Sequence, residues 1–191
     1  MRVIAGEFRS RRLKSIPGDA TRPTPDRMRE TLFNILGPRV EDAIFLDAYA
    51  GTGAVGIEAL SRGAGHVFFL ERSRAAIETI RENLAMLNVG RRATVLTGPA
   101  LLTIARQRAD IVFLDPPYDL VREYEAVLAL LAESPPSLTI VQHSIRQAMP
   151  EAQGALTRTR MVKQGDNALS FYSASRPEES PSTTSDSSAA P

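Results

Sequence analysis

Cysteine is absent from this chain of 191 residues. Without thiols the protein can form no disulfide bond, bind no metal through thiolates and use no cysteine nucleophile. Long apolar runs are missing too. The longest covers residues 126–132, far short of the roughly 20 residues that a membrane-spanning helix needs. The first residues contain no stretch typical of a signal peptide, so we expect a cytoplasmic protein with no membrane contact.

Basic side chains are concentrated at the start of the chain. Residues 1–40 hold nine Lys and Arg against four Asp and Glu, whereas the remaining residues carry a small acidic excess. A basic arm on an acidic body suits a polyanion such as nucleic acid, because neutralisation of phosphates contributes sequence-independent affinity. The alternative is an ordinary solvated surface. The length allows one core domain with appendages, and we take a monomer as the default.

Apolar runs of strand length alternate with helical patterns through most of the chain. We expect strands at 44–48, 67–71, 94–97, 111–115 and 138–143, and helices at 55–62, 73–88, 100–108 and 123–132. Such alternation predicts an α/β protein with a parallel, doubly wound, Rossmann-like sheet. Strands at 158–163 and 169–172, separated by a turn-like stretch, predict a C-terminal antiparallel hairpin and a seven-stranded sheet.

The two ends of the chain differ from this pattern. Residues 2–16 alternate loosely around a break and predict a short basic hairpin. Thr24 and Pro25 are typical of a helix start, and Gly37-Pro38 of its end. After residue 173 the chain is rich in Ser and Pro, so we expect disorder. The predicted organisation is an N-terminal extension at 1–40, a catalytic domain at 41–173 and a tail at 174–191.

A glycine-rich turn, DAYAGTGAVG at residues 47–56, follows the first predicted strand and opens a helix. Dinucleotide-binding folds and methyltransferases both place such a turn here, with an acid after the second strand to bind a ribose, here Glu71. Asp47 favours a methyltransferase, because a carboxylate repels pyrophosphate but attracts the cationic end of S-adenosylmethionine. Glu71 could instead cap the following helix. The expected cofactor-binding residues are Asp47, Tyr49, Ala50, Gly51, Thr52, Gly53, Glu71 and Ala100.

The predicted reaction centre is Asp115-Pro116-Pro117-Tyr118, at the end of the fourth parallel strand. An exocyclic amino group of a base is a poor nucleophile because its lone pair is delocalised into the ring. The Asp115 carboxylate and the Pro116 carbonyl can each accept an amino hydrogen and localise that lone pair. The prolines lack N–H groups and fix two φ angles, and the Tyr118 ring can stack on an extruded base. A strand-ending turn is the alternative interpretation.

Five segments together resemble the RsmD type of 16S ribosomal RNA (guanine-N2) methyltransferase over residues 1 to about 173. They lie at residues 2–6, 22–34, 47–64, 115–118 and 165–172. The glycine and Asp-Pro-Pro-Tyr motifs occur in many amino methyltransferases. The Arg-Pro-Thr segment at residues 22–34 narrows the match to this family.

The resemblance implies a substrate and an RNA-facing side. It implies methylation of the N2 amino group of a guanine in 16S rRNA, within the 30S subunit or its assembly intermediate. The implied methyl donor is S-adenosylmethionine, and no metal is implied. Carried onto matching positions, it implies RNA contacts at Arg2, Arg9, Arg11, Arg12, Lys14, Arg22, Thr24, Arg27, Arg29 and Asn34. The alternative is a packed helix with merely solvated arginines.

The sequence departs from the family pattern in two places. Pro99 stands where relatives usually place Asp or Asn against the adenine, so adenine recognition would depend on the Ala100 amide. Gln142-His143 stands where relatives often have an acid, and we expect His143 and His66 to be structural. Two other functions stay open: amino methylation of DNA at adenine N6 or cytosine N4, and a non-catalytic RNA-binding factor in ribosome assembly.

Overall fold

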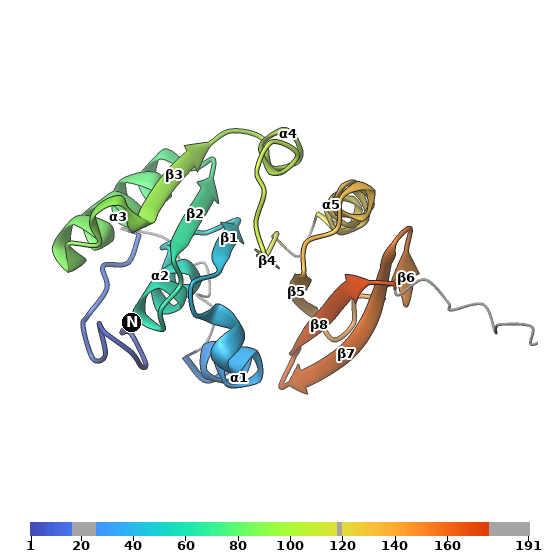
Figure 1. Cartoon of the computed structure of the whole chain (residues 1–191), viewed down its shortest axis with the longest axis horizontal. Coiled ribbons are helices and arrows are strands. Elements are labelled where there is room, and N and C mark those ends of the chain that lie inside the picture. The colour runs from blue at the N-terminus through green and yellow to red at the C-terminus, as the bar shows by residue number, and fades with distance from the viewer. Residues whose placement is uncertain (17–25, 118–119, 176–191) are drawn as a thin grey trace, which may run out of the picture.

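The computed structural model describes residues 1–16, 26–117 and 120–175, and these residues form one mixed sheet with helices on both faces (Figure 1). The strand order is β3-β2-β1-β4-β5-β8-β7-β6. The strands are β1 (Ile44–Ala48), β2 (His66–Glu71), β3 (Ala93–Thr97), β4 (Ile111–Leu114), β5 (Leu138–Ser144), β6 (Ala152–Gln153), β7 (Leu156–Gln164) and β8 (Asn167–Ala174).

The first five strands are parallel, and β5, β8, β7 and β6 pair antiparallel. Every residue of β4 is buried, as expected for a strand covered on both faces. The chain runs outward from β1 to β3 and then returns to place β4 on the other side of β1. This reversal at β1 and β4 is the topological switch point, where open α/β sheets bind their ligands.

Two apolar cores lie on opposite faces of the sheet. One contains residues of α1, α2 and α3, and the other contains residues of α4 and α5. The helices are α1 (Asp26–Leu36), α2 (Ala54–Ser61), α3 (Arg74–Leu87), α4 (Ala100–Ile104) and α5 (Val121–Glu133), with 3-10 turns η1 (Gly37–Val40) and η2 (Gly90–Arg92). No helix among the described residues is long and apolar enough to cross a membrane.

The N-terminal segment departs from the predicted hairpin. It forms a compact loop with a single bridge between Arg2 and Arg12 rather than two strands. Side chains at its ends and middle, Val3, Phe8 and Leu13, are buried in the core that also contains α1 and α2. Backbone hydrogen bonds still join its two arms, from the Val3 N–H to the Arg11 carbonyl and from the Leu13 N–H to the Met1 carbonyl. Side-chain hydrogen bonds to α2 hold the loop on the body of the protein.

Two further predictions of the secondary structure were wrong in detail. The sheet has eight strands rather than seven among the described residues, because Ala152–Gln153 forms the short strand β6 against the start of β7. Helix α4 ends at Ile104 rather than near residue 108. Thr24, Pro25 and the tail after residue 175 lie outside the described residues. The division into an extension and a catalytic domain at residue 40 stays a prediction.

Candidate active site

A cavity of about 1090 Å³ opens at the carboxyl ends of β1, β2 and β4. It is lined by both motifs found in the sequence, the glycine-rich turn after β1 and the segment that follows β4. Parallel strands bring their carboxyl ends to one edge of the sheet, so motifs about 60 residues apart in the chain meet at the switch point. The position predicted for the reaction centre, at the same edge as the glycine-rich turn, is therefore the one observed.

The glycine-rich turn has a backbone that depends on its glycines. Gly51 and Gly53 have φ of 55° and 78°, and Tyr49 also has a positive φ, 65°. Gly56 serves packing, because a Cβ at this position would lie 2.3 Å from the Phe69 ring on β2. The turn thus passes close to the cavity while α2 packs tightly on the sheet.

Asp47 is a buried carboxylate in the cavity wall. Its side chain is 2% exposed, and its Oδ2 accepts a hydrogen bond of 2.8 Å from the Gly56 N–H. Burial raises the pKa of Asp47 well above its ordinary value, and the carboxylates of Asp115 and Glu71 raise it further, whereas the Gly56 hydrogen bond lowers it. A cationic ligand in the cavity would compensate this charge, so the site fits the positively charged methionine end of S-adenosylmethionine.

Replacing Asp47 with asparagine should stabilise the ligand-free protein at neutral pH and weaken cofactor binding. A folded-state pKa above the unfolded value, about 3.9, means that stability is lost as the pH rises through the folded pKa. The amide can still accept the Gly56 N–H but carries no buried charge. Melting curves from pH 4 to 8 should show a higher melting temperature for the variant than for the wild type. This difference should grow with pH, at about 2–4 °C per kcal/mol of added stability. A difference in melting temperature that does not change with pH would contradict a raised pKa of Asp47 in the folded protein.

Glu71 makes contacts at the start of α3 and also lines the cavity, whereas its role in ribose binding stays a prediction. Its Oε2 accepts a hydrogen bond of 2.9 Å from the Gly51 N–H, and its Oε1 accepts bonds of 2.8 Å from the N–H groups of Arg72 and Ser73. The carboxylate therefore ties the glycine-rich turn to the start of α3 and lies in the cavity wall. Carboxylate oxygens can accept more than one hydrogen bond each, so ribose hydroxyls can still be bound here.

The reaction centre has two hydrogen-bond partners that the sequence did not reveal. The Gln142 amide Nε2 donates to Asp115 Oδ2 at 3.0 Å, and the Tyr124 hydroxyl donates to the Pro116 carbonyl at 3.1 Å. The Tyr124 side chain therefore fixes the Pro116 carbonyl. The sequence alone had indicated only that the prolines lack N–H groups. Tyr118, the expected stacking ring, lies outside the described residues.

The cavity wall also includes residues that no motif indicated. Met1, Ser15 and Ile16 of the N-terminal segment line it, and the Thr52 hydroxyl lies 3.9 Å from the Met1 sulfur. They were missed because their proximity depends on the fold of the N-terminal loop. Gly98, Pro99 and Ala100 also line the cavity, with Pro99 at the N-cap of α4. Recognition of the adenine by the Ala100 amide stays a prediction.

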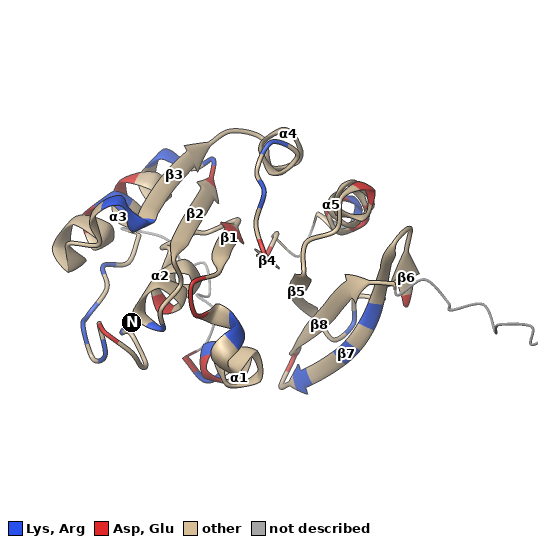
Figure 2. Cartoon of the chain, in the orientation of Figure 1, with Lys and Arg blue, Asp and Glu red and all other residues tan. Residues whose placement is uncertain are grey.

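Most basic residues expected to contact RNA are exposed. Figure 2 marks the positions of Lys and Arg along the described chain in blue. The exposed ones are Arg2, Arg9, Arg11, Arg12, Lys14 and Arg27, together with the polar residue Asn34. Arg22 and Thr24 lie outside the described residues.

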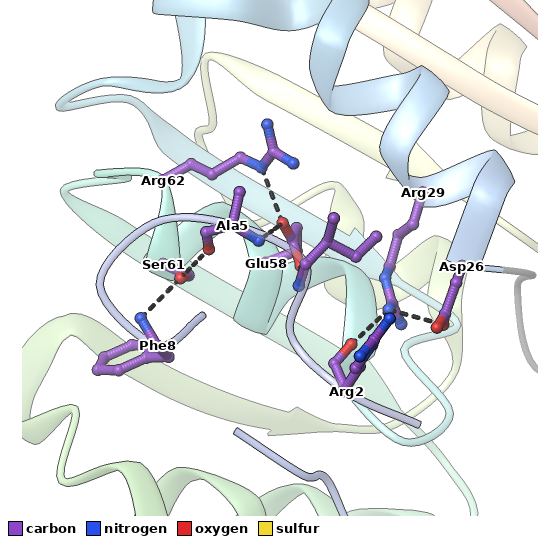
Figure 3. Close-up of polar contacts among 9 residues, drawn as sticks. Arg2, Ala5, Phe8, Asp26, Arg29, Glu58, Ser61 and Arg62 are labelled. Carbon is purple, nitrogen blue, oxygen red and sulfur yellow. Dashed lines mark hydrogen bonds and ion pairs between the residues drawn. The ribbon is translucent and has the colours of Figure 1, made fainter. Parts of the chain in front are cut away.

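The prediction that Arg29 contacts RNA is wrong. It is fully buried, and its Nη2 donates to the Arg2 carbonyl at 2.6 Å and to Asp26 at 2.9 Å, as Figure 3 shows. Burial lowers the pKa of this guanidinium, against the opposing effect of Asp26. A side chain enclosed in this way cannot reach a phosphate on the surface. We therefore assign it to docking α1 on the N-terminal loop.

Both histidines have the structural surroundings expected for them. His143 is buried between the Ser144 carbonyl and the Ser170 hydroxyl, each 2.8 Å from a ring nitrogen. Burial lowers the pKa of His143, which favours the neutral ring. His66 lies 3.0 Å from the Thr94 hydroxyl, between neighbouring strands. Neither ring is among the residues that line the cavity.

A glycine-rich turn, two acids at the carboxyl ends of neighbouring strands and an Asp-Pro-Pro segment surround one cavity at the switch point of the sheet. These features define the class of protein: a methyltransferase that uses S-adenosylmethionine. The particular family follows from comparison with known proteins. The family model described as "Conserved hypothetical protein 95" matches residues 1–173, and the chain belongs to this family of RsmD-type methyltransferases.

Individual relatives agree with this membership. Ribosomal RNA small subunit methyltransferase D of Escherichia coli K12 is 43% identical over 120 residues, 62% of this chain and 60% of that one. YlbH of Bacillus subtilis is 36% identical over 181 residues, 90% and 98% of the two chains. The solved structure of yhhF from Escherichia coli has a TM-score of 0.77 at 35% identity, covering 91% and 97%.

A more distant solved structure shares the fold. The RNA methyltransferase of Salinibacter ruber, in complex with S-adenosyl-L-homocysteine, has a TM-score of 0.63 at 16% identity and covers 84% of this chain and 97% of that one. At this identity the likeness concerns the Rossmann-like architecture alone.

Proposed function

We propose that this protein transfers the methyl group of S-adenosylmethionine to the N2 amino group of a guanine in 16S ribosomal RNA. The observation that carries the proposal is the convergence of the Asp115 carboxylate and the Pro116 carbonyl, each held by a buried hydrogen-bond donor, on the cofactor cavity. The relatives named ribosomal RNA small subunit methyltransferase D support the choice of RNA.

The protein's own groups account for activation of the amino nitrogen. The Asp115 carboxylate and the Pro116 carbonyl each accept one amino hydrogen, which favours a pyramidal nitrogen with a localised lone pair. Asp47, Glu71 and the glycine-rich turn would hold the cofactor, which supplies an electrophilic methyl group on a sulfonium. The N–C bond would form as the S–C bond breaks and the sulfur keeps the electron pair, and the methylated nitrogen would then give up one proton to the Asp115 carboxylate or to water. The reaction depends on holding nitrogen and methyl in line.

The basic N-terminal loop supports RNA as the polymer that brings the guanine to the cavity. Arg9, Arg11 and Arg12 are exposed, and the same loop contributes Met1 to the cavity wall. Arginines on this loop could bind phosphates flanking the target nucleotide, which would be extruded from its stack to reach Asp115. The assembled 30S subunit or its assembly intermediate is the proposed substrate.

The test is incubation of the protein with tritiated S-adenosylmethionine and 30S subunits from cells that lack the enzyme, followed by nucleoside analysis. We expect label in N2-methylguanosine. Label in another nucleoside would keep the methyltransferase and overturn the guanine assignment. If the protein binds cofactor but labels neither 30S subunits nor free ribosomal RNA, the rRNA substrate is wrong. Parallel reactions with duplex DNA test amino methylation of adenine or cytosine.

A further inference from the structure

Two buried side chains from different elements hold the two hydrogen-bond acceptors of the reaction centre. Tyr124 comes from α5 and Gln142 from β5. Tyr124 is 2% exposed and Gln142 is 3% exposed. Neither residue belongs to the Asp-Pro-Pro-Tyr motif, yet one donates to the Pro116 carbonyl and the other to the Asp115 carboxylate.

Tyr124 fixes the direction of the Pro116 carbonyl. A carbonyl oxygen has two lone pairs and can accept two hydrogen bonds in the plane of its peptide. The Tyr124 hydroxyl, 3.1 Å away, engages one of them in a buried environment. Rotation of the Pro116–Pro117 peptide would break this bond and leave a buried hydroxyl to find another partner. The second lone pair can then be directed at an amino hydrogen of the base.

Gln142 fixes the Asp115 carboxylate in a comparable way. An ionised carboxylate only accepts hydrogen bonds, so the amide nitrogen faces Asp115 and the amide oxygen faces away. Within the described part of the chain this oxygen, Oε1, is buried and has no hydrogen-bond partner. Such an acceptor costs free energy, and an apolar side chain of the same size would avoid that cost. The feature that a glutamine adds here is its N–H donor to Asp115.

We propose that Tyr124 and Gln142 are positioning residues for methyl transfer, which set the two acceptors at the separation that one amino group requires. The proposal depends on the proposed function, because it assigns the amino hydrogens to Asp115 and Pro116. Each positioning residue acts through the acceptor that it holds, so its loss should lower turnover more than substrate binding.

The first test compares Tyr124→Phe with Tyr172→Phe. Tyr172 is a matched control, since it is also buried and its hydroxyl donates to a proline carbonyl, that of Pro150, at 2.8 Å. We expect Tyr124→Phe to lower kcat about tenfold with both KM values nearly unchanged, and Tyr172→Phe to leave kcat unchanged. Melting temperatures and cofactor affinities of both variants show whether each is folded. Equal kcat values for the two folded variants would overturn the role of Tyr124.

The second test uses Gln142→Met and Gln142→Glu. Methionine removes the donor at similar volume and should lower kcat about tenfold. Glutamate places a second carboxylate against Asp115, and two carboxylates in contact share a proton. The pH profile of kcat in this variant should therefore differ from that of the wild type. If the folded methionine variant kept the wild-type kcat, the glutamine would be merely structural, and that result would overturn the proposal.

The wild-type reaction separates the two proposals. If wild-type protein fails to methylate guanine in ribosomal RNA, the proposed function is wrong. If wild-type protein is active and the folded Tyr124 and Gln142 variants keep its kcat, the positioning role alone is wrong.

Discussion

An Asp115→Ala variant is expected to lose more than about a hundredfold in turnover while its affinity for S-adenosylmethionine stays nearly intact. The carboxylate accepts an amino hydrogen of the base in the proposed reaction, so its removal affects the step in which the nitrogen lone pair must localise. In the proposed site the turn after β1 and Glu71 hold the cofactor, and the hydrogen bond from the Gly51 N–H to Glu71 does not involve Asp115.

Single-turnover methylation of 30S subunits and calorimetric titration of the cofactor measure these two quantities. Glu125→Ala is the control, because Glu125 is an exposed acid on α5 and its removal should change neither quantity. Equal losses of turnover and of cofactor affinity in the Asp115 variant would mean that the residue is structural.

A Glu58→Ala variant is expected to lose about 3–5 kcal/mol of folding free energy. The Glu58 carboxylate on α2 is fully buried and accepts hydrogen bonds from the N–H groups of Ile4 and Ala5 and from Arg62, as Figure 3 shows. Its removal leaves two backbone donors and a largely buried guanidinium without their acceptor. The docking of the N-terminal loop should weaken with it, because Ser61 is the other α2 side chain that binds this loop.

Urea denaturation measures the loss, and Glu78→Ala provides a matched control. Glu78 forms the same type of ion pair, four residues from Arg74, but both side chains are exposed. Exposed pairs contribute about 0–1 kcal/mol, so the control should unfold close to the wild type. Similar losses in the two variants would show that the buried carboxylate does not hold the loop. Gly6 of the N-terminal loop packs closely against the same helix, α2, since a Cβ at this position would lie 1.8 Å from the Ser61 carbonyl oxygen.

Local signals allowed much of the fold and part of the site to be predicted. The strand from Ile44 to Ala48 was identified with its observed bounds, because a run of apolar residues between turn signals has few alternatives. Gly51 and Asp115 were predicted as site residues and line the cavity, because backbone conformation and chemistry restrict the residue types allowed after a strand. The short strand β6 was missed because two residues carry too little pattern, and its pairing depends on the neighbouring β7.

The sequence by itself therefore determined the order of strands and helices, the glycine-rich turn and the Asp-Pro-Pro segment. The tertiary structure decided which distant side chains complete the site: Tyr124 and Gln142 at the two acceptors, Met1 in the cavity wall, and Arg29 buried instead of facing RNA. The physical reason is the range of the interactions. Backbone preference and apolar periodicity act between residues a few positions apart, whereas burial and hydrogen-bond pairing depend on which segments the sheet brings together.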